Sequence, residues 1–318
     1  MKKVGQSKQD KAKRRNLKRR LFIRRARKYW LNKRQSILTN VFLVCLSGLV
    51  VLLAILGVGW VSGGEMALVE QASQMSLGRV FSGELVNWTY VLLAKGIFAI
   101  FGLGFWAIKL PNLLIAIGCL WLFNSVARQW LSRSVANLTT LLFATGIGFL
   151  TSALTADGSI LYILYPLLIF WLINKISLAD RKQPFIIALF VVGAVAVYTP
   201  YMVLILALAV LASFWHPKTR FFFAQAEKNT FFIGLITTVA ILLPLIITIF
   251  FEPLILKTLF LPVDFAHSFT NLGQTMLSSI IAFRSGFFEG HLTPLFDLAT
   301  FGLFILGMGQ VIRNRYSY

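Results

Sequence analysis

Long apolar runs, separated by short polar stretches, make up most of this chain. The first run, Ser36–Trp60, contains no charged residue, and its roughly 25 positions suffice to cross a hydrocarbon core of about 30 Å as a helix. Further apolar runs lie at 88–106, 110–127, 135–154, 159–174, 185–215, 231–251 and 293–312. Backbone polar groups cannot stay unpaired in lipid, so apolar runs of this length are helices. The pattern predicts an all-α polytopic membrane protein.

The basic residues between the runs decide which runs cross the membrane. If 88–106 stays at the outer surface, ten bases between the later runs and at the chain end fall on the cytoplasmic side, where Lys and Arg are retained. These bases are Arg128, Arg133, Lys175, Arg181, Lys182, Lys218, Arg220, Lys228, Arg313 and Arg315. If 88–106 crossed, the eight bases from Arg128 to Lys228 would lie outside. We therefore expect 88–106 to be an interfacial or re-entrant element.

The run 185–215 is too long for one straight span and carries Tyr198-Thr199-Pro200-Tyr201 at its middle. Proline disfavours helical conformation in the residue before it, so two spans joined by an outer turn are expected. The count is then about eight transmembrane helices with both termini cytoplasmic. The outer face receives the loops 61–109 and 252–292, and the first of these carries amphipathic interfacial helices.

Charge is concentrated at the N-terminus. Residues 1–34 hold 16 of the 31 Lys and Arg residues and one acid, Asp10, within a net charge of +20. This predicts a basic cytoplasmic arm (1–35), followed by a transmembrane domain (36–318) in the plasma membrane. The arm suits an anionic leaflet, where each base contributes on the order of 1 kcal/mol. Membrane lipids are therefore its expected partner, and nucleic-acid binding is the less favoured interpretation because little excess charge lies elsewhere.

The acids gather on the predicted outer face, so chemistry is expected there. Glu65 and Glu70 lie on a short amphipathic helix just after the first span. Ser62-x-x-Glu65 fits a capping box. Glu65 also qualifies as a general base at the membrane surface, where burial raises the pKa of a carboxylate. Both interpretations stay open.

Asp157 precedes the next span, in Thr155-Ala156-Asp157-Gly158-Ser159, as either an N-cap or a functional carboxylate. The outer bases snorkel to headgroups, or one or two of them bind a phosphate near Glu65 and Asp157. They are Arg79, Lys95, Lys109, Lys257 and Arg284. His267 and His291 lack the partners of a zinc site, and no metal ligand or cofactor is assigned.

The order of these elements resembles the membrane glycosyltransferases of the GT-C superfamily, in the group of protein O-mannosyltransferases and the aminoarabinose transferase of lipid A. In that group the first span is followed by the pattern D-E-x-x-Y-x-E-x-A-x-x-M. The matching positions are Gly64–Met75, Phe101-Gly102, Lys109-Leu110-Pro111, Asp157, Tyr198–Tyr201, Leu243-Pro244 and Gly290–Asp297. Gly64 stands where the family has its Asp, and Asn87-Trp88-Thr89 replaces a Lys-Pro-Pro.

The resemblance implies inverting sugar transfer from a polyprenyl-phosphate donor to a lipid, glycan or protein hydroxyl at the outer face. It implies catalytic carboxylates at Glu65, the base, and Asp157. Substrate contacts are expected at Glu70, Arg79, Lys95, Arg284 and His291. Three alternatives remain open. They are a catalytically impaired relative that binds polyprenyl lipid or partners, a transporter or flippase, and a structural anchor. The flippase is disfavoured because no charged residue lies deep in a span and no internal repeat is evident.

Overall fold

A computed structural model describes residues 37–55, 63–74, 86–156, 158–178, 182–200, 202–215, 228–255 and 259. Within these ranges the secondary structure is helical and contains no strand. The helices are Ile37–Ile55, α2 (Gly63–Gln74), α3 (Trp88–Phe101), α4 (Phe105–Trp130), α5 (Arg133–Thr145), α6 (Ile147–Leu154), α7 (Leu161–Leu178), α8 (Gln183–Ala196), α9 (Met202–Trp215) and α11 (Lys228–Phe251).

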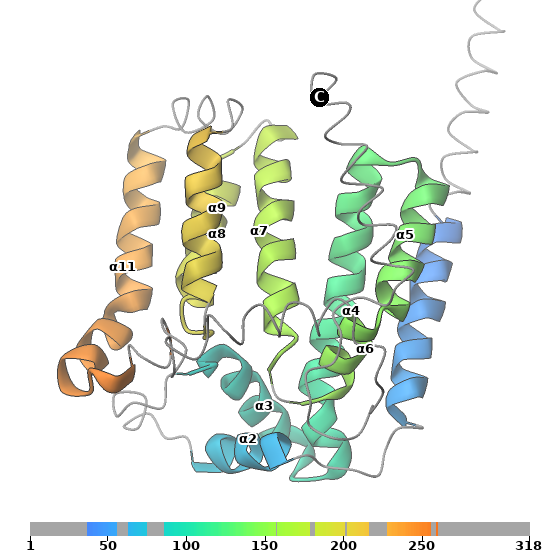
Figure 1. Cartoon of the computed structure of the whole chain (residues 1–318), viewed down its shortest axis with the longest axis horizontal. Coiled ribbons are helices and arrows are strands. Elements are labelled where there is room, and N and C mark those ends of the chain that lie inside the picture. The colour runs from blue at the N-terminus through green and yellow to red at the C-terminus, as the bar shows by residue number, and fades with distance from the viewer. Residues whose placement is uncertain are drawn as a thin grey trace, which may run out of the picture.

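The longer helices run side by side, while α2 and α3 lie across one end of them (Figure 1). We call this the α2/α3 end, and the opposite end, where α4 stops and α5 begins, the α4/α5 end. The predicted interfacial element 88–106 corresponds to α3 and the start of α4. Figure 1 shows α3 across one end of the bundle, and the placement of 88–106 at the outer membrane surface stays a prediction.

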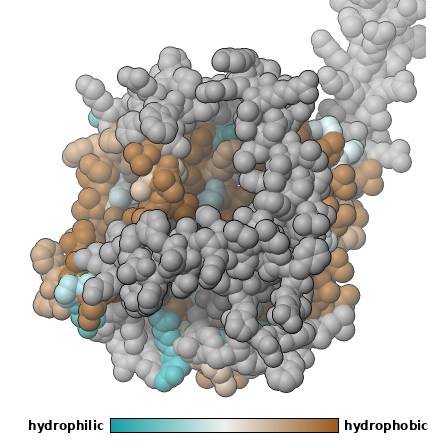
Figure 2. Space-filling view, in the orientation of Figure 1, coloured by the Kyte–Doolittle hydropathy of each residue, from teal (hydrophilic) through white to brown (hydrophobic). Residues whose placement is uncertain are grey.

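Several of the described helices have the length and composition of membrane spans. Three are long and apolar enough to cross a bilayer: Ile37–Ile55, Trp106–Trp130 and Asn229–Phe251. A fourth span results if α5 and α6, bent by 61°, are counted together. The helices α7, α8 and α9 are apolar but shorter, and the predicted span 293–312 lies outside the described residues. Apolar side chains cover much of the visible described surface, as lipid contact requires (Figure 2).

Two predicted runs are interrupted in the structure. The run 185–215 divides into α8 and α9 around Pro200, as predicted. The run 135–154, predicted as one span, consists of two helices that meet at Gly146, whose ψ of 133° is extended. Gly146 and Gly148 flank the bend, and glycine is a weak helix former that lets the chain leave helical geometry cheaply.

The main core lies where α3, α4 and α7 meet. The buried face of α3 consists of Tyr90, Val91, Ala94 and Ile97, which recur at the three-to-four-residue spacing of one helix face. On α4 the small residues Ala116 and Cys119 are fully buried against this cluster. The opposite side of α3 exposes Leu92, Leu93, Ile100 and Phe101. A helix with apolar groups on both sides fits a position between a protein core and lipid.

The helices α8 and α11 approach closely at Gly234. A Cβ atom at that position would overlap the ring of Phe190 on α8. The same ring packs edge-on against Phe231, with ring centroids 5.2 Å apart. Glycine is therefore required at Gly234 by packing, because any side chain would push the two helices apart.

Candidate functional site at the α2/α3 end

A buried ion pair marks the α2/α3 end. Glu65, in the first turn of α2, is only 1% exposed. Its Oε1 accepts hydrogen bonds from the ammonium of Lys109 and, at 2.7 Å, from the backbone N–H of Ala156. The three residues belong to segments far apart in the sequence. Burial of a carboxylate is costly unless it is paired and hydrogen-bonded, and both conditions are met here.

Lys109 extends the network to the end of α6. It lies in the first turns of α4, is 12% exposed, and also donates to the backbone carbonyl of Leu154 at 2.9 Å. The last carbonyls of a helix have no partner within the helix and carry partial negative charge. An ammonium group is therefore well placed there.

Asn112, one turn further along α4, also donates hydrogen bonds to carbonyls at the end of α6. It is fully buried, and its side-chain amide donates to the carbonyls of Ser152, at 2.5 Å, and of Thr155. Residues three apart on a helix share a face, so Lys109 and Asn112 together satisfy three carbonyls at the end of α6. The position of the segment that leads to Asp157 is therefore set by side chains of α4 and α2.

The start of α3 closes the other side of this region. Asn87 has a φ of 54°, and its N–H donates to the carbonyl of Tyr198 at 2.9 Å. The hydroxyls of Thr89 and Tyr165 lie 2.8 Å apart, which joins α3 to α7. The Trp88 and Tyr198 rings pack edge-to-face at 5.3 Å. The α6–α7 turn, the first turn of α3 and the α8–α9 turn thus meet at one end of the molecule.

Of the predicted site residues, the structure describes Glu65, Glu70 and Lys95. Glu70 is exposed on α2 and Lys95 is half-buried on α3. Asp157, Arg79, Arg284 and His291 lie outside the described residues. The carboxylate of Glu65 bonds the residue directly before Asp157 in the chain, although 91 positions separate Glu65 from Ala156. Ser62, the partner of Glu65 in the capping-box interpretation, is also outside the described residues.

Two residues of the network were not predicted as site residues. Lys109 was one of several predicted outer bases, and Asn112 was not singled out. The spacing Lys109-x-x-Asn112 at the start of an apolar run was the available clue, since two polar residues on one face of such a helix need buried partners. Among the described residues, no group of three or more His, Cys, Asp or Glu side chains is arranged to hold a metal ion.

In comparisons with known proteins, no family model, no curated protein and no solved structure matches the chain. The resemblance to GT-C glycosyltransferases therefore rests on the short motifs alone.

Proposed function

We propose that the chain is a membrane glycosyltransferase that takes a sugar from a polyprenyl-phosphate donor at the outer face of the plasma membrane. In this proposal about eight helices cross the bilayer, both termini are cytoplasmic, and the α2/α3 end faces outward. The arm at residues 1–35 lies on the anionic inner leaflet. The acceptor is a lipid, glycan or protein hydroxyl.

One observation carries the proposal. A carboxylate and an ammonium group, on α2 and α4, are buried together beside the segment that leads to Asp157. Ionisable groups are expensive near a bilayer and are usually kept there for function. The motifs from which the resemblance was argued, at Gly64–Met75, Lys109-Leu110-Pro111 and Asp157, come from three separate segments. The first two segments are in direct contact through the Glu65–Lys109 ion pair. The Glu65 carboxylate also accepts a hydrogen bond from Ala156, the residue before Asp157.

The proposed reaction is a single inverting displacement. The acceptor oxygen forms a bond to the anomeric carbon, the bond between that carbon and the phosphate oxygen breaks, and polyprenyl phosphate leaves with the electron pair. The acceptor proton passes to the Glu65 carboxylate, with Asp157 orienting the hydroxyl. The Lys109 ammonium is bonded to Oε1 of Glu65, so Lys109 moves off when the carboxylate takes the acceptor proton. The released ammonium would join Arg79, Lys95 and Arg284 around the leaving phosphate, with Glu70 and His291 at the sugar or acceptor.

A second candidate is a catalytically impaired relative that binds polyprenyl lipid or partners. It is favoured by the way Glu65 is used. The carboxylate is almost wholly buried and engaged by an ammonium and a backbone N–H, which is how a purely structural carboxylate is held. Gly64 also offers no carboxylate where the resembled family has one.

Transfer assays on the full chain in lipid nanodiscs separate the two candidates. Polyprenyl-phosphate hexose and pentose donors, labelled in the sugar, are supplied with a panel of hydroxyl acceptors, and release of polyprenyl phosphate is measured. Glu65→Gln should lower turnover by a factor on the order of 10²–10⁴, the usual contribution of a positioned base. Gly64→Asp should raise it. The matched control is Glu252→Gln, an exposed acid just after α11, which should leave turnover unchanged.

Loss of the ion pair is a separate effect that must be distinguished from loss of the base. The double variant Glu65→Gln/Lys109→Met removes both charges and should recover thermal stability without recovering turnover. If wild type and Gly64→Asp both show no transfer while polyprenyl phosphate still binds, the enzyme proposal fails and the lipid-binding candidate replaces it.

A further inference from the structure

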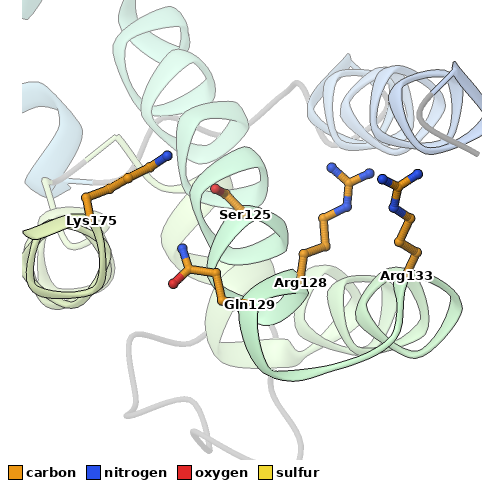
Figure 3. A pocket seen from close by; sticks show the side chains of 5 residues that line it. All are labelled: Ser125, Arg128, Gln129, Arg133 and Lys175. Carbon is orange, nitrogen blue, oxygen red and sulfur yellow. The ribbon is translucent and has the colours of Figure 1, made fainter. Parts of the chain in front are cut away.

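A basic pocket lies at the α4/α5 end, far along α4 from the ion pair. It has a volume of about 350 Å³ and is lined by Ser125, Arg128 and Gln129 of α4, Arg133 of α5 and Lys175 of α7. Three of the five lining residues are cations and none is an acid. Figure 3 shows the Arg128 and Arg133 guanidinium groups next to one another, and Lys175 reaching in from the facing helix.

The pocket holds like charges close together, which is unfavourable without a counter-charge. Arg133 acts electrostatically on Arg128 as a neighbouring positive charge. The Nε atom of Arg128 is buried and has no hydrogen-bond partner among the described residues. Like charges this close repel each other, and the repulsion is stronger where less solvent screens them. An anion in the pocket would remove this repulsion and supply the missing acceptor.

Other side chains hold the pocket open in this shape. The indole N–H of Trp171 donates to the hydroxyl of Ser125 at 3.2 Å, which joins α7 to α4. The ammonium of Lys175 lies 5.4 Å from the centre of the same indole ring, at cation–π distance. Lys175 is thus kept near the pocket by Trp171.

The start of α5 adds to the positive potential. Arg133 is its first residue, its first turn holds no acid, and Ser132 at the N-cap makes no side-chain capping bond. The N-terminal end of a helix carries about half a positive charge and free N–H groups. This end of α5 and the three cations act in the same direction.

We propose that the basic pocket binds a phosphate group, through the guanidinium groups of Arg128 and Arg133 and the ammonium of Lys175. Arginine matches phosphate oxygens with paired N–H donors, and lysine adds a point charge. Arg128 lies two residues before the end of the candidate span Trp106–Trp130, and the ends of a span meet the headgroup region of a bilayer. Basic pockets between membrane helices bind lipid headgroups, so the expected source is an anionic phospholipid. Soluble phosphate shares the same chemistry.

The test uses the full chain in nanodiscs of phosphatidylcholine, with or without phosphatidylglycerol, and a third arm with inorganic phosphate in the buffer. Retained lipid is counted by native mass spectrometry, and the thermal unfolding midpoint is followed in each arm. Phosphatidylglycerol should be retained and should raise the midpoint. Arg128→Gln and Arg133→Gln should each weaken retention by about tenfold or more, the value of a lost hydrogen bond to a charged group.

Two further variants make the result specific to the pocket. Lys182→Gln is the matched control: it removes one charge at the N-cap of α8, outside the pocket lining, and should retain lipid as wild type does. Arg128→Lys keeps the charge but loses the paired donors, so it should fall between wild type and Arg128→Gln. If Arg128→Gln does not fold, the loss of lipid retention in Arg133→Gln and Lys175→Gln tests the same prediction.

Three outcomes decide the proposal. Equal loss of retention in Lys182→Gln and in the pocket variants would overturn it, because lipid would then be held by general surface charge, including that of the N-terminal arm. A midpoint raised by inorganic phosphate alone, and lost in Arg128→Gln, would support a phosphate site but replace the lipid source by a soluble one. No pocket-dependent response to either would overturn the proposal altogether.

Discussion

The two ends of the bundle treat charge in opposite ways. At the α2/α3 end, the Glu65 carboxylate is buried with Lys109, and both are further bonded to backbone groups. At the α4/α5 end, Arg128, Arg133 and Lys175 line one pocket, and none of the five described residues that line it is an acid. Charge removed from the first end should therefore destabilise the protein. Charge removed from the second should change what the protein binds.

The two ends also differ in what their charged residues do: one group fixes the position of a chain segment, and the other lines a pocket that is open to a ligand. The α2/α3 network joins α2, α4 and the end of α6, so its charges set where the segment before Asp157 lies. The basic pocket joins α4, α5 and α7 around a volume that a ligand can enter. The first arrangement is satisfied within the chain, whereas the second is completed by an anion from outside.

The largest effect is expected from breaking the ion pair on one side only. Lys109→Met leaves the Glu65 carboxylate buried without its counter-charge, which typically lowers the free energy of unfolding by about 3–5 kcal/mol. The double variant Glu65→Gln/Lys109→Met should regain most of this loss. Unfolding in a denaturing-detergent titration measures both. Lys182→Met is the control, and a Lys109→Met protein as stable as wild type would contradict a structural role for the pair.

Asn112→Leu should have the next largest effect. The substitution keeps the volume similar but leaves the carbonyls of Ser152 and Thr155 without the Asn112 amide. A buried polar group that loses its partner costs about 1–3 kcal/mol. Hydrogen exchange should also rise locally at residues 151–156. Asn229→Leu, at an exposed position of α11, should change neither, and protection at 151–156 equal to wild type would refute the assigned role of Asn112.

A smaller loss is expected from Gly158→Ala, in the turn that follows Asp157. Gly158 has a φ of 80°, which costs a residue with a side chain about 1–2 kcal/mol. The added Cβ would lie 3.5 Å from Asn87 and Tyr90, an ordinary contact, so the cost is in the backbone alone. Gly118→Ala, in open space within α4, should instead stabilise by about 0.5–1 kcal/mol. The thermal midpoints of the two variants should move in opposite directions, and a shared direction would argue against this turn geometry.

The smallest effect, and of opposite sign, is expected for Arg128→Gln. In a zwitterionic detergent without added phosphate, this change relieves repulsion with Arg133 and should raise stability by a few tenths of a kcal/mol, as for other partly exposed charges. The gain should shrink as salt rises, because salt screens the repulsion. A loss comparable to that of Lys109→Met would show that the two ends do not differ in the way described.

Much of the fold could be predicted from local pattern. The apolar runs predicted helices, and Pro200 predicted the division between α8 and α9. That 88–106 does not cross the bilayer, which follows from the distribution of bases, stays a prediction. The bend at Gly146 was missed because its run contains no charged residue or proline, and hydropathy alone does not respond to a change of helix direction. The count of eight spans and the cytoplasmic N-terminus stay predictions.

Less of the candidate site could be predicted. Glu65 was predicted from its place after the first span, but its engagement by Lys109 and Ala156 depends on contacts across 44 and 91 positions. Asn112 was not singled out, because a single amide in an apolar run gives the same local sequence pattern whether it faces lipid or a helix end. For the basic pocket, the sequence predicted only that Arg128, Arg133 and Lys175 lie on the cytoplasmic side, and not that they lie together.

The sequence by itself therefore determined the helical, membrane-type character of the chain and the segments that form its helices, since both follow from hydropathy, proline and charge along a local window. Only the tertiary structure decided which charges meet. Pairing of Glu65 with Lys109, and grouping of Arg128, Arg133 and Lys175, depend on how α4 packs against α2, α6, α5 and α7. Such contacts are set by three-dimensional packing, and their energies depend on burial that no local window contains.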